Sequence, residues 1–333
     1  MSKEDRLAFI RKAQVWTPTD VPAMNIRLGP QGKGAFPPNA VVTCDYIKTK
    51  LSGSSRKFEC RTADGDTIKV RYGAGNGEVQ GSVLASRLLW ALGFGADRVY
   101  AARVICRGCS PDPWTEHERQ SGEQLFDPVA IERKPAGIEM KSGNHSGWGW
   151  QELALVDPAE GGAPASQRDA LTLLAVLMQH SDNKPDQQRL LCLPGGVTVE
   201  GRCDTPFLAL HDVGLTFGRA NFSNSHNTAS VNFVEWDKTP VWRNAQTCIG
   251  HLNKSSTGTL GDPTIHEAGR AFLADLLIQL TDQQLHDLFD VARVTLRSRR
   301  PDGTVAAAGA SVDEWVAAFK HKRHDIVATH CPH

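Results

Sequence analysis

Two aspartates in this sequence lie where carboxylates could carry out group-transfer chemistry. Asp182 belongs to the segment His180-Ser181-Asp182-Asn183-Lys184-Pro185-Asp186-Gln187, and Asp212 belongs to the segment His211-Asp212-Val213-Gly214. Each segment follows an apolar run, so each aspartate is expected at the end of a folded element. One carboxylate held in this way can orient a hydroxyl group and accept its proton, while the other binds the magnesium ion of a nucleotide. Two carboxylates of this kind are compatible with the transfer of a phosphoryl group.

The two segments resemble the catalytic loop of protein kinases, H-R-D-x-K-P-E-N, and their D-F-G metal-binding motif. The resemblance implies that Asp182 acts on the acceptor hydroxyl and that Lys184 neutralises charge on the transferred phosphoryl group. It implies that Asp212 and Gln187 hold Mg²⁺. It also implies ATP as the phosphate donor, and an acceptor that is a protein, a lipid head group or a small molecule. An atypical branch of the superfamily fits best, of the lipid-kinase-like, toxin-kinase-like or secretory-kinase-like kind.

Residue 187 is where the loop departs from the family. Gln187 stands in place of an Asn, and it keeps the amide oxygen on a side chain one methylene longer. Gln188 and Asp186 are alternative ligands beside it. No A-P-E motif follows Asp212 at the usual distance. A catalytically inactive pseudokinase, acting as a binding or scaffold module, is therefore the alternative interpretation.

A cation and a carboxylate precede these motifs in the order that a kinase uses. Lys69, in Thr67-Ile68-Lys69-Val70, resembles the lysine of V-A-I-K, and Glu78 opens the next predicted helix and could reach back to it. Both residues also have plain structural explanations, since strand lysines usually face outward and the helix dipole favours a glutamate in the first turn. Arg71 is an alternative cation, because side chains two apart on a strand share a face.

Two loops could cover the phosphates of a nucleotide. The loop Ser52-Gly53-Ser54-Ser55 joins the first two predicted strands, and its hydroxyl and backbone N–H groups suit phosphate binding, with Gly53, Ser54 and Ser55 as the candidate residues. The loop Gly29–Gly34 contains more glycine, but prolines flank it and no clear strand precedes it. Because the serine-rich loop lies between two predicted strands, it is the favoured candidate for the phosphate-covering loop.

The order of predicted elements indicates an α+β fold. We expect a bilobal, protein-kinase-like fold with an antiparallel sheet and one helix in the N-lobe and a mostly helical C-lobe. The expected divisions are an N-terminal extension at 1–38, the N-lobe at 39–136 and the C-lobe at 137–333. The elements are predicted as follows: strands at 40–48, 57–62, 67–72, 97–106 and 129–134, an irregular insertion at 107–128, and helices at 77–92, from 166, at 265–280 and at 282–296.

Charge and hydropathy exclude several partners. The 333 residues contain 37 Lys plus Arg and 37 Asp plus Glu, so the charge gives no reason to expect nucleic acid or an anionic membrane surface as a partner. No apolar run approaches the roughly 20 residues of a membrane span. The first residues lack the apolar stretch of a secretory signal, so a cytoplasmic location is the default expectation.

Eight cysteines point in the opposite direction, toward an exported form with disulfides. The alternative is reduced thiols in the cytosol. The tail from 321 to 333, which includes Cys331, is expected to be a solvated, frayed terminus. Three pairs stand out by position: Cys44 with Cys60 on neighbouring predicted strands, Cys106 with Cys109 in a C-x-x-C that suggests a local disulfide or plain thiols, and Cys192 with Cys203 across a glycine-rich turn.

Overall fold

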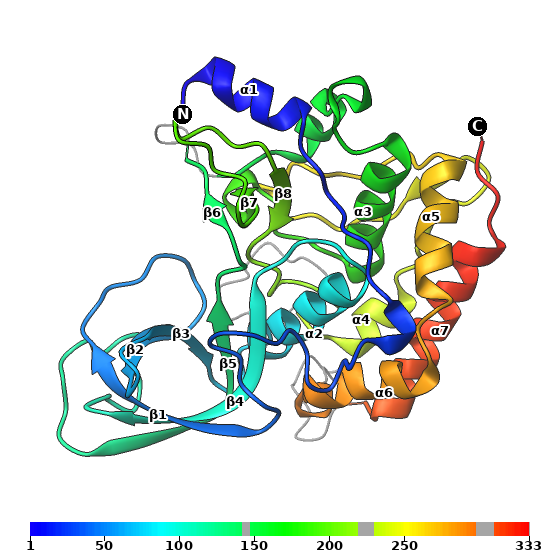
Figure 1. The fold of residues 1–333 in the computed structure, drawn as a ribbon. Helices are drawn as coiled ribbons and strands as arrows, with labels where there is room; N and C mark the ends of the chain where they lie inside the picture. The colour runs from blue at the N-terminus through cyan, green and yellow to red at the C-terminus, as the bar shows by residue number, and fades with distance from the viewer. Residues whose placement is uncertain (142–146, 219–229, 298–309, 333) are drawn as a thin grey trace.

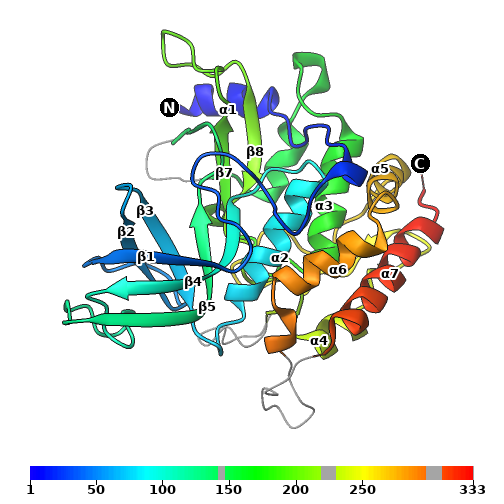
Figure 2. The ribbon, with the colours of Figure 1, turned by 60° about the horizontal axis from the view of Figure 1, so that its bottom comes forward.

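The computed structural model describes residues 1–141, 147–218, 230–297 and 310–332. Figure 1 shows a β-barrel at one end of the molecule, most of the helices at the other end, and helix α2 between them. Figure 2 shows the same arrangement from a second direction, with β7 and β8 beside the barrel. The mixed α and β composition predicted from the sequence is confirmed.

Five strands close into the barrel. They are β1 (Ala40–Ile47), β2 (Lys57–Thr62), β3 (Thr67–Tyr72), β4 (Arg98–Arg107) and β5 (Glu123–Arg133), joined in the order β1-β2-β3-β5-β4. The neighbours along this order are antiparallel, but β1 also pairs with β4 in parallel. The sequence predicted an antiparallel sheet, but the parallel pair of β1 and β4 closes the sheet into a barrel.

Closure of the barrel follows from the alternation of apolar residues along its strands. Every second side chain of β1 points inward and meets the inward side chains of the other strands. The interior is a separate apolar core that includes both cysteines of the β1–β2 pair. This core contains Val42, Cys44, Tyr46, Phe58, Cys60, Ile68, Val70, Tyr72, Ala102, Val104, Cys106, Cys109, Phe126, Val129 and Ile131.

The strand β5 is longer than the sequence predicts. It begins at Glu123, so the last part of the predicted irregular insertion at 107–128 belongs to a strand. Its charged residues conceal the strand pattern there, because this end of β5 is exposed and pairs only with β4. After β5 the chain passes the Pro135-Ala136-Gly137 turn into a small second sheet of β6 (Ile138–Glu139), β7 (Gln188–Cys192) and β8 (Pro206–Leu210).

The helices pack around a large apolar core. Helix α2 contributes buried residues to this core and also contacts β4 and β5 of the barrel. Capping boxes of Thr281 with Gln284 and of Ser311 with Glu314 begin the helices α6 and α7. The remaining elements are α1 (Lys3–Arg11), η1 (Val21–Ala23), α2 (Glu78–Ala91), η2 (Trp150–Leu155), η3 (Pro158–Glu160), α3 (Ala165–Met178), η4 (Pro185–Gln187), α4 (Phe233–Lys238), β9 (Trp242–Asn244), β10 (Ile249–Gly250), α5 (Glu267–Leu277), α6 (Asp282–Val291), η6 (Val294–Leu296) and α7 (Val312–Ala328).

The N-terminal segment is part of the large core. Residues 14 and 16 form bridges with Phe207 and Phe94, and the segment then crosses α2, where Arg87 donates to the carbonyl oxygens of Ile26 and Arg27. The buried side chains of this segment are Phe9, Ile10, Ala13, Val15, Val21 and Ile26. The segment therefore packs against α2 as part of the large core.

All eight cysteines form disulfides. The bonds join Cys44 to Cys60, Cys106 to Cys109, Cys192 to Cys203 and Cys248 to Cys331. The expectation of a frayed C-terminal tail is wrong up to Cys331, because this bond ties the tail to a residue 83 positions earlier and Cys331 is buried. Across the described ranges, no helix is long and apolar enough to span a membrane.

Candidate active site

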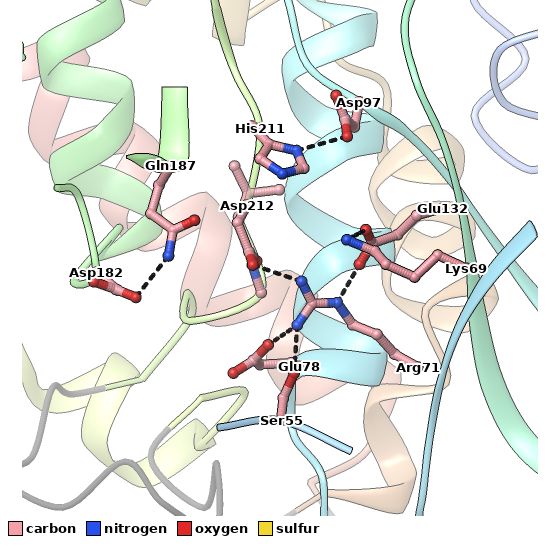
Figure 3. Close-up of polar contacts among 12 residues, drawn as sticks. Ser55, Lys69, Arg71, Glu78, Asp97, Glu132, Asp182, Gln187, His211 and Asp212 are labelled. Atoms are coloured by element: carbon pink, nitrogen blue, oxygen red, sulfur yellow. Dashed lines mark hydrogen bonds and ion pairs between the residues drawn. The ribbon is translucent and has the colours of Figure 1, made fainter. Parts of the chain in front are cut away.

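The centre of the candidate site is the guanidinium group of Arg71 on β3. Its side chain is only 1% exposed, and it donates to Glu78 on α2, Glu132 on β5, Asp212 after β8, and Ser55 in the β1–β2 loop. The bonds to Asp212 and Ser55 are both 2.6 Å long. Figure 3 shows these side chains converging on the guanidinium from four elements. One buried arginine thus joins residues up to 141 positions apart.

Burial and charge act against each other in this cluster. Burial lowers the pKa of Arg71, but Asp212, Glu132 and Glu78 outweigh it and hold the pKa well above its ordinary value. Burial raises the pKa of Glu132 and Asp212, yet Arg71 reverses the effect, so the pKa of Glu132 falls to about 2 and that of Asp212 falls as well. Both carboxylates are therefore ionised at neutral pH.

Glu78 behaves differently from its two neighbours. Burial and the negative charge of Asp212 raise the pKa of its carboxyl group to about 7, against the lowering effect of Arg71. The physical reason is that three carboxylates share one guanidinium. As the pH rises, the carboxyl group whose charged form burial destabilises most, Glu78, loses its proton last.

The expected pair between Lys69 and Glu78 is replaced by the pair between Arg71 and Glu78. Lys69 shares a strand face with Arg71, but its ammonium group forms an ion pair with Glu132 and its side chain remains 24% exposed. The sequence analysis named Arg71 as the alternative cation, and the structure places Arg71 in this position. Lys69 and Asp212 lie around the same cluster, since the charge of Lys69 lowers the pKa of Asp212. The segment of Lys69 and the segment of Asp212 thus meet at one site.

The loop that carries Asp182 lies beside the Asp212 segment. The carbonyl oxygen of Gln187 accepts hydrogen bonds from the backbone N–H groups of His211, at 2.8 Å, and Asp212, at 3.3 Å. The carboxylate of Asp182 accepts from Lys184 Nζ at 3.2 Å and from Gln187 Nε2 at 2.9 Å. Figure 3 shows Gln187 between Asp182 and Asp212. The structure therefore brings both predicted motifs to one side of the Arg71 cluster.

Two glycines allow α2 to approach the Asp212 segment. A Cβ atom on Gly81 would overlap the carbonyl oxygen of Gly214, and a Cβ on Gly214 would lie 2.8 Å from Cβ of Glu78. The last position of Asp-Val-Gly therefore sets the distance between the first turns of α2 and Asp212. The sequence signals only one of these glycines, since Gly81 in a helix carries no motif.

A second buried arginine lies on the other side of His211. Arg189 on β7 donates to both carboxylate oxygens of Asp97, at 3.0 and 3.2 Å, and to Glu139 on β6 at 2.6 Å. The ring of His211 lies 2.7 Å from Asp97. This network joins the start of β4 to the second sheet. Its member His211 directly precedes Asp212, which belongs to the Arg71 cluster.

A polar cavity of about 690 Å³ lies between these two networks. Its lining includes Lys69 and Glu132 from the barrel, and Arg189 and His211 from the second sheet. Lys33 and Gly34, from the less favoured candidate phosphate loop, also line it. The volume is in the range of small-molecule sites, roughly 300 to 1,000 Å³. The loop Gly29–Gly34 thus borders the same cavity, while Ser55 of the favoured loop contacts Arg71 directly.

Sequence reasoning missed several members of these networks. Glu132 is the only acidic residue in the apolar run that ends β5, and this position could have signalled a functional carboxylate. Asp97 and Arg189 carry no such signal, because each follows a turn where charged residues are common. Among the described residues, no group of three or more His, Cys, Asp or Glu side chains gathers at metal-binding distance.

Comparisons with known proteins identify no family. No protein-family model matches the chain, and no curated protein matches it. Among solved structures, the chain is similar to the proinflammatory kinase CtkA of Helicobacter pylori, with 10% identity, a TM-score of 0.45, and coverage of 87% of this chain and 96% of that chain. A likeness of this degree does not define an activity, so the functional assignment depends on the site itself.

Proposed function

We propose that this protein is an ATP- and Mg²⁺-dependent phosphotransferase of an atypical kinase type that acts on an alcohol group. One observation carries the proposal: Arg71 of β3 binds both Glu78 of α2 and Asp212, and the loop of Asp182 lies next to Asp212. Phosphoryl transfer depends on placing such a cation, its carboxylate partner and two further aspartates around one cleft.

The residues present fit a magnesium ion. Mg²⁺ takes oxygen ligands, usually one or two from the protein, together with waters and substrate phosphates. Asp212 supplies an ionised carboxylate. Gln187 directs Nε2 to Asp182, and in the described part of the chain its Oε1 accepts no hydrogen bond. Asp212 and Gln187 would therefore hold the ion, which when bound offsets negative charge on the phosphate oxygens.

The remaining residues have separate tasks in the proposed reaction. Asp182, 17% exposed, would orient the acceptor hydroxyl and accept its proton. Lys184 lies beside it and would offset charge on the transferred phosphoryl group. Arg71 would fix Asp212 relative to α2. Its four hydrogen bonds to the protein leave one of its five N–H donors without a partner among the described residues.

The test is Mg²⁺-dependent ATP binding and turnover in the wild-type protein and in Asp212→Asn. Bound Mg–ATP should raise the melting temperature, since a ligand at 100 times its Kd stabilises the native state by about 2.7 kcal/mol. We expect Asp212→Asn to remove the Mg²⁺-dependent shift and to lower phosphate transfer by about 10²-fold or more. A screen of protein, lipid-head-group and small-molecule alcohols would identify the acceptor.

The matched control is Asp204→Asn, which makes the same chemical change at an exposed position in the β7–β8 hairpin. It should leave both measurements unchanged. Binding without any turnover would favour the scaffold alternative, and a wild-type protein that shows no shift with any divalent metal would contradict a nucleotide site altogether.

A further inference from the structure

A lysine that the sequence motifs do not mark lies at the edge of the Arg71 cluster. Lys57 is the first residue of β2, and in the antiparallel pairing it stands directly opposite Arg71. Cross-strand partners project from the same face of a sheet, so Lys57 and Arg71 face the same side. Lys57 is partly buried.

The other cations of the site already have carboxylate partners. Arg71 binds three carboxylates, Lys69 binds Glu132, and Lys184 binds Asp182. Lys57 differs: within the described ranges its ammonium group has neither a hydrogen bond nor an ion pair, and its ring contact is with Trp114, at 5.7 Å. Burial, followed by the charge of Arg71, lowers its pKa. A partly buried ammonium group without a carboxylate partner favours the binding of an anion beside it.

The ammonium group of Lys57 lies beneath the serine-rich loop. A Cβ atom built on Gly53 would lie 2.9 Å from Lys57 Nζ, and Gly53 has a φ of +98°. The positive φ favours glycine at this position, and the short distance shows that the loop backbone lies close to the cation. Ser52 and Ser54 are exposed on either side of Gly53, whereas Ser55 is held by Arg71.

We propose that Lys57 and the loop Ser52–Ser55 form the phosphate-binding site of the cleft, with Lys57 Nζ contacting the phosphate oxygens of the donor nucleotide. This inference rests on the proposed phosphotransfer function. It assigns to Lys57 the role that the V-A-I-K resemblance gives to Lys69. The loop then provides hydroxyl and N–H donors around an anion that Lys57 attracts.

The experiment measures binding of Mg–ATP and of Mg–tripolyphosphate by calorimetry to the full, oxidised chain. The variants are Lys57→Met, Lys57→Arg and Lys69→Met, with Lys50→Met as a control that removes the same charge at an exposed position before the loop. We expect Lys57→Met to weaken both ligands by about 10- to 100-fold, the range of a hydrogen bond to a charged group. Lys57→Arg should recover most of this loss, Lys69→Met should cost less than about threefold, and Lys50→Met should change little.

A second measurement separates this role from a structural one. Because Lys57 has no bonded partner among the described residues, the Lys57→Met protein without ligand should melt at the same temperature as wild type or higher. Lower thermal stability together with weaker binding would show that Lys57 supports the fold and would overturn the proposal. Wild-type affinity in Lys57→Met together with a tenfold loss in Lys69→Met would also overturn it.

The two ligands distinguish the two proposals. Wild-type protein that binds tripolyphosphate through Lys57 but transfers no phosphate from ATP would refute the phosphotransferase and keep the anion site. Turnover of ATP that does not depend on Lys57 would refute the anion site and keep the phosphotransferase. Wild-type protein that binds neither ligand would overturn both.

Discussion

The molecule contains two networks built around a buried arginine, and they differ in what they surround. Arg71 joins β3, α2, β5 and the Asp212 segment, next to the loop of Asp182. Arg189 joins β7, the start of β4 and β6, through Asp97 and Glu139. Both arginines are held by carboxylate groups from distant parts of the chain, but only the first network contains one of the two predicted catalytic aspartates, and the second contains His211 of the same segment.

The Arg71 network positions a candidate catalytic residue, whereas the Arg189 network joins structural elements to one another. Arg71 holds Asp212, a candidate metal ligand, whereas Arg189 holds Asp97 and Glu139, which lie in neither predicted motif. The two networks are adjacent because His211 belongs to the second and Asp212 to the first. We therefore expect mutations in both to destabilise the fold, but only those in the first to remove nucleotide chemistry.

Arg71→Met should have the largest effect. It leaves Glu78, Glu132 and Asp212 with only Lys57 and Lys69 as cations acting on them among the lysines of the site. Removal of one partner from a buried ionic network typically costs about 3–5 kcal/mol. We expect a large drop in the urea midpoint and no Mg–ATP binding at temperatures where the variant remains folded. Arg71→Lys, which keeps the charge but loses the forked geometry, should lie between Arg71→Met and wild type.

Arg189→Met should destabilise the fold by a smaller amount, about 2–3 kcal/mol, since Glu139 is partly exposed and His211 still contacts Asp97. Below its melting temperature, the variant should bind Mg–ATP within a few-fold of wild type by calorimetry. Loss of binding equal to that of Arg71→Met would end the distinction between the two networks.

The sequence predicted the elements of the barrel and helix α2 closely, because apolar alternation and helical periodicity are local properties. The segments of Asp182 and Asp212 were predicted to act together, and the structure places them side by side. The choice of Arg71 over Lys69 required the structure, since both side chains share one face of β3. That choice depends on where Glu78 in the first turn of α2 and Asp212 after β8 lie relative to β3.

Closure of the barrel and the disulfide of Cys331 could not be predicted from the sequence, because both join segments that lie far apart in the chain. Parallel pairing of β1 with β4 joins strands that lie about 60 residues apart in the sequence, and no turn signals it. The partners Cys248 and Cys331 are likewise separated by 83 positions. Contacts between distant segments leave no periodic pattern in either segment alone.

Gly81→Ala tests the contact that places the first network against α2. Alanine favours a helix over glycine by up to about 1 kcal/mol, but its methyl group would overlap the carbonyl oxygen of Gly214. Overpacking of this kind costs about 1–3 kcal/mol, so we expect a net loss of about 1–2 kcal/mol by chemical denaturation and reduced activity. Gly75→Ala is the matched control, because a Cβ atom there meets nothing within 4 Å. Equal stability of both variants would contradict the proposed contact.

Glu78→Gln should be visible as a change in the pH dependence of stability. The pKa of Glu78 is raised from an ordinary value of 4.5 to about 7, so the native state retains a proton that the unfolded chain loses. This contribution to stability is full below about pH 4.5 and is lost as the pH rises through about 7. The variant lacks it, so wild-type stability relative to Glu78→Gln should fall by on the order of 1–3 kcal/mol across that interval.

Urea denaturation at several pH values measures this difference directly. Glu132 and Asp212 have lowered pKa values, and their contributions are lost only in acid, in both proteins. They therefore cancel in the comparison above about pH 4.5. A wild-type advantage that grows as the pH rises would mean that Arg71 keeps Glu78 ionised in the native state.

The disulfides divide the molecule into two separately reinforced parts. The bonds Cys44–Cys60 and Cys106–Cys109 lie before the Pro135-Ala136-Gly137 turn, and the bonds Cys192–Cys203 and Cys248–Cys331 lie after it. No covalent link crosses the turn other than the backbone. The cross-links thus act within each part, and the two parts are joined across the turn by packing and by ion pairs such as that between Arg71 and Asp212.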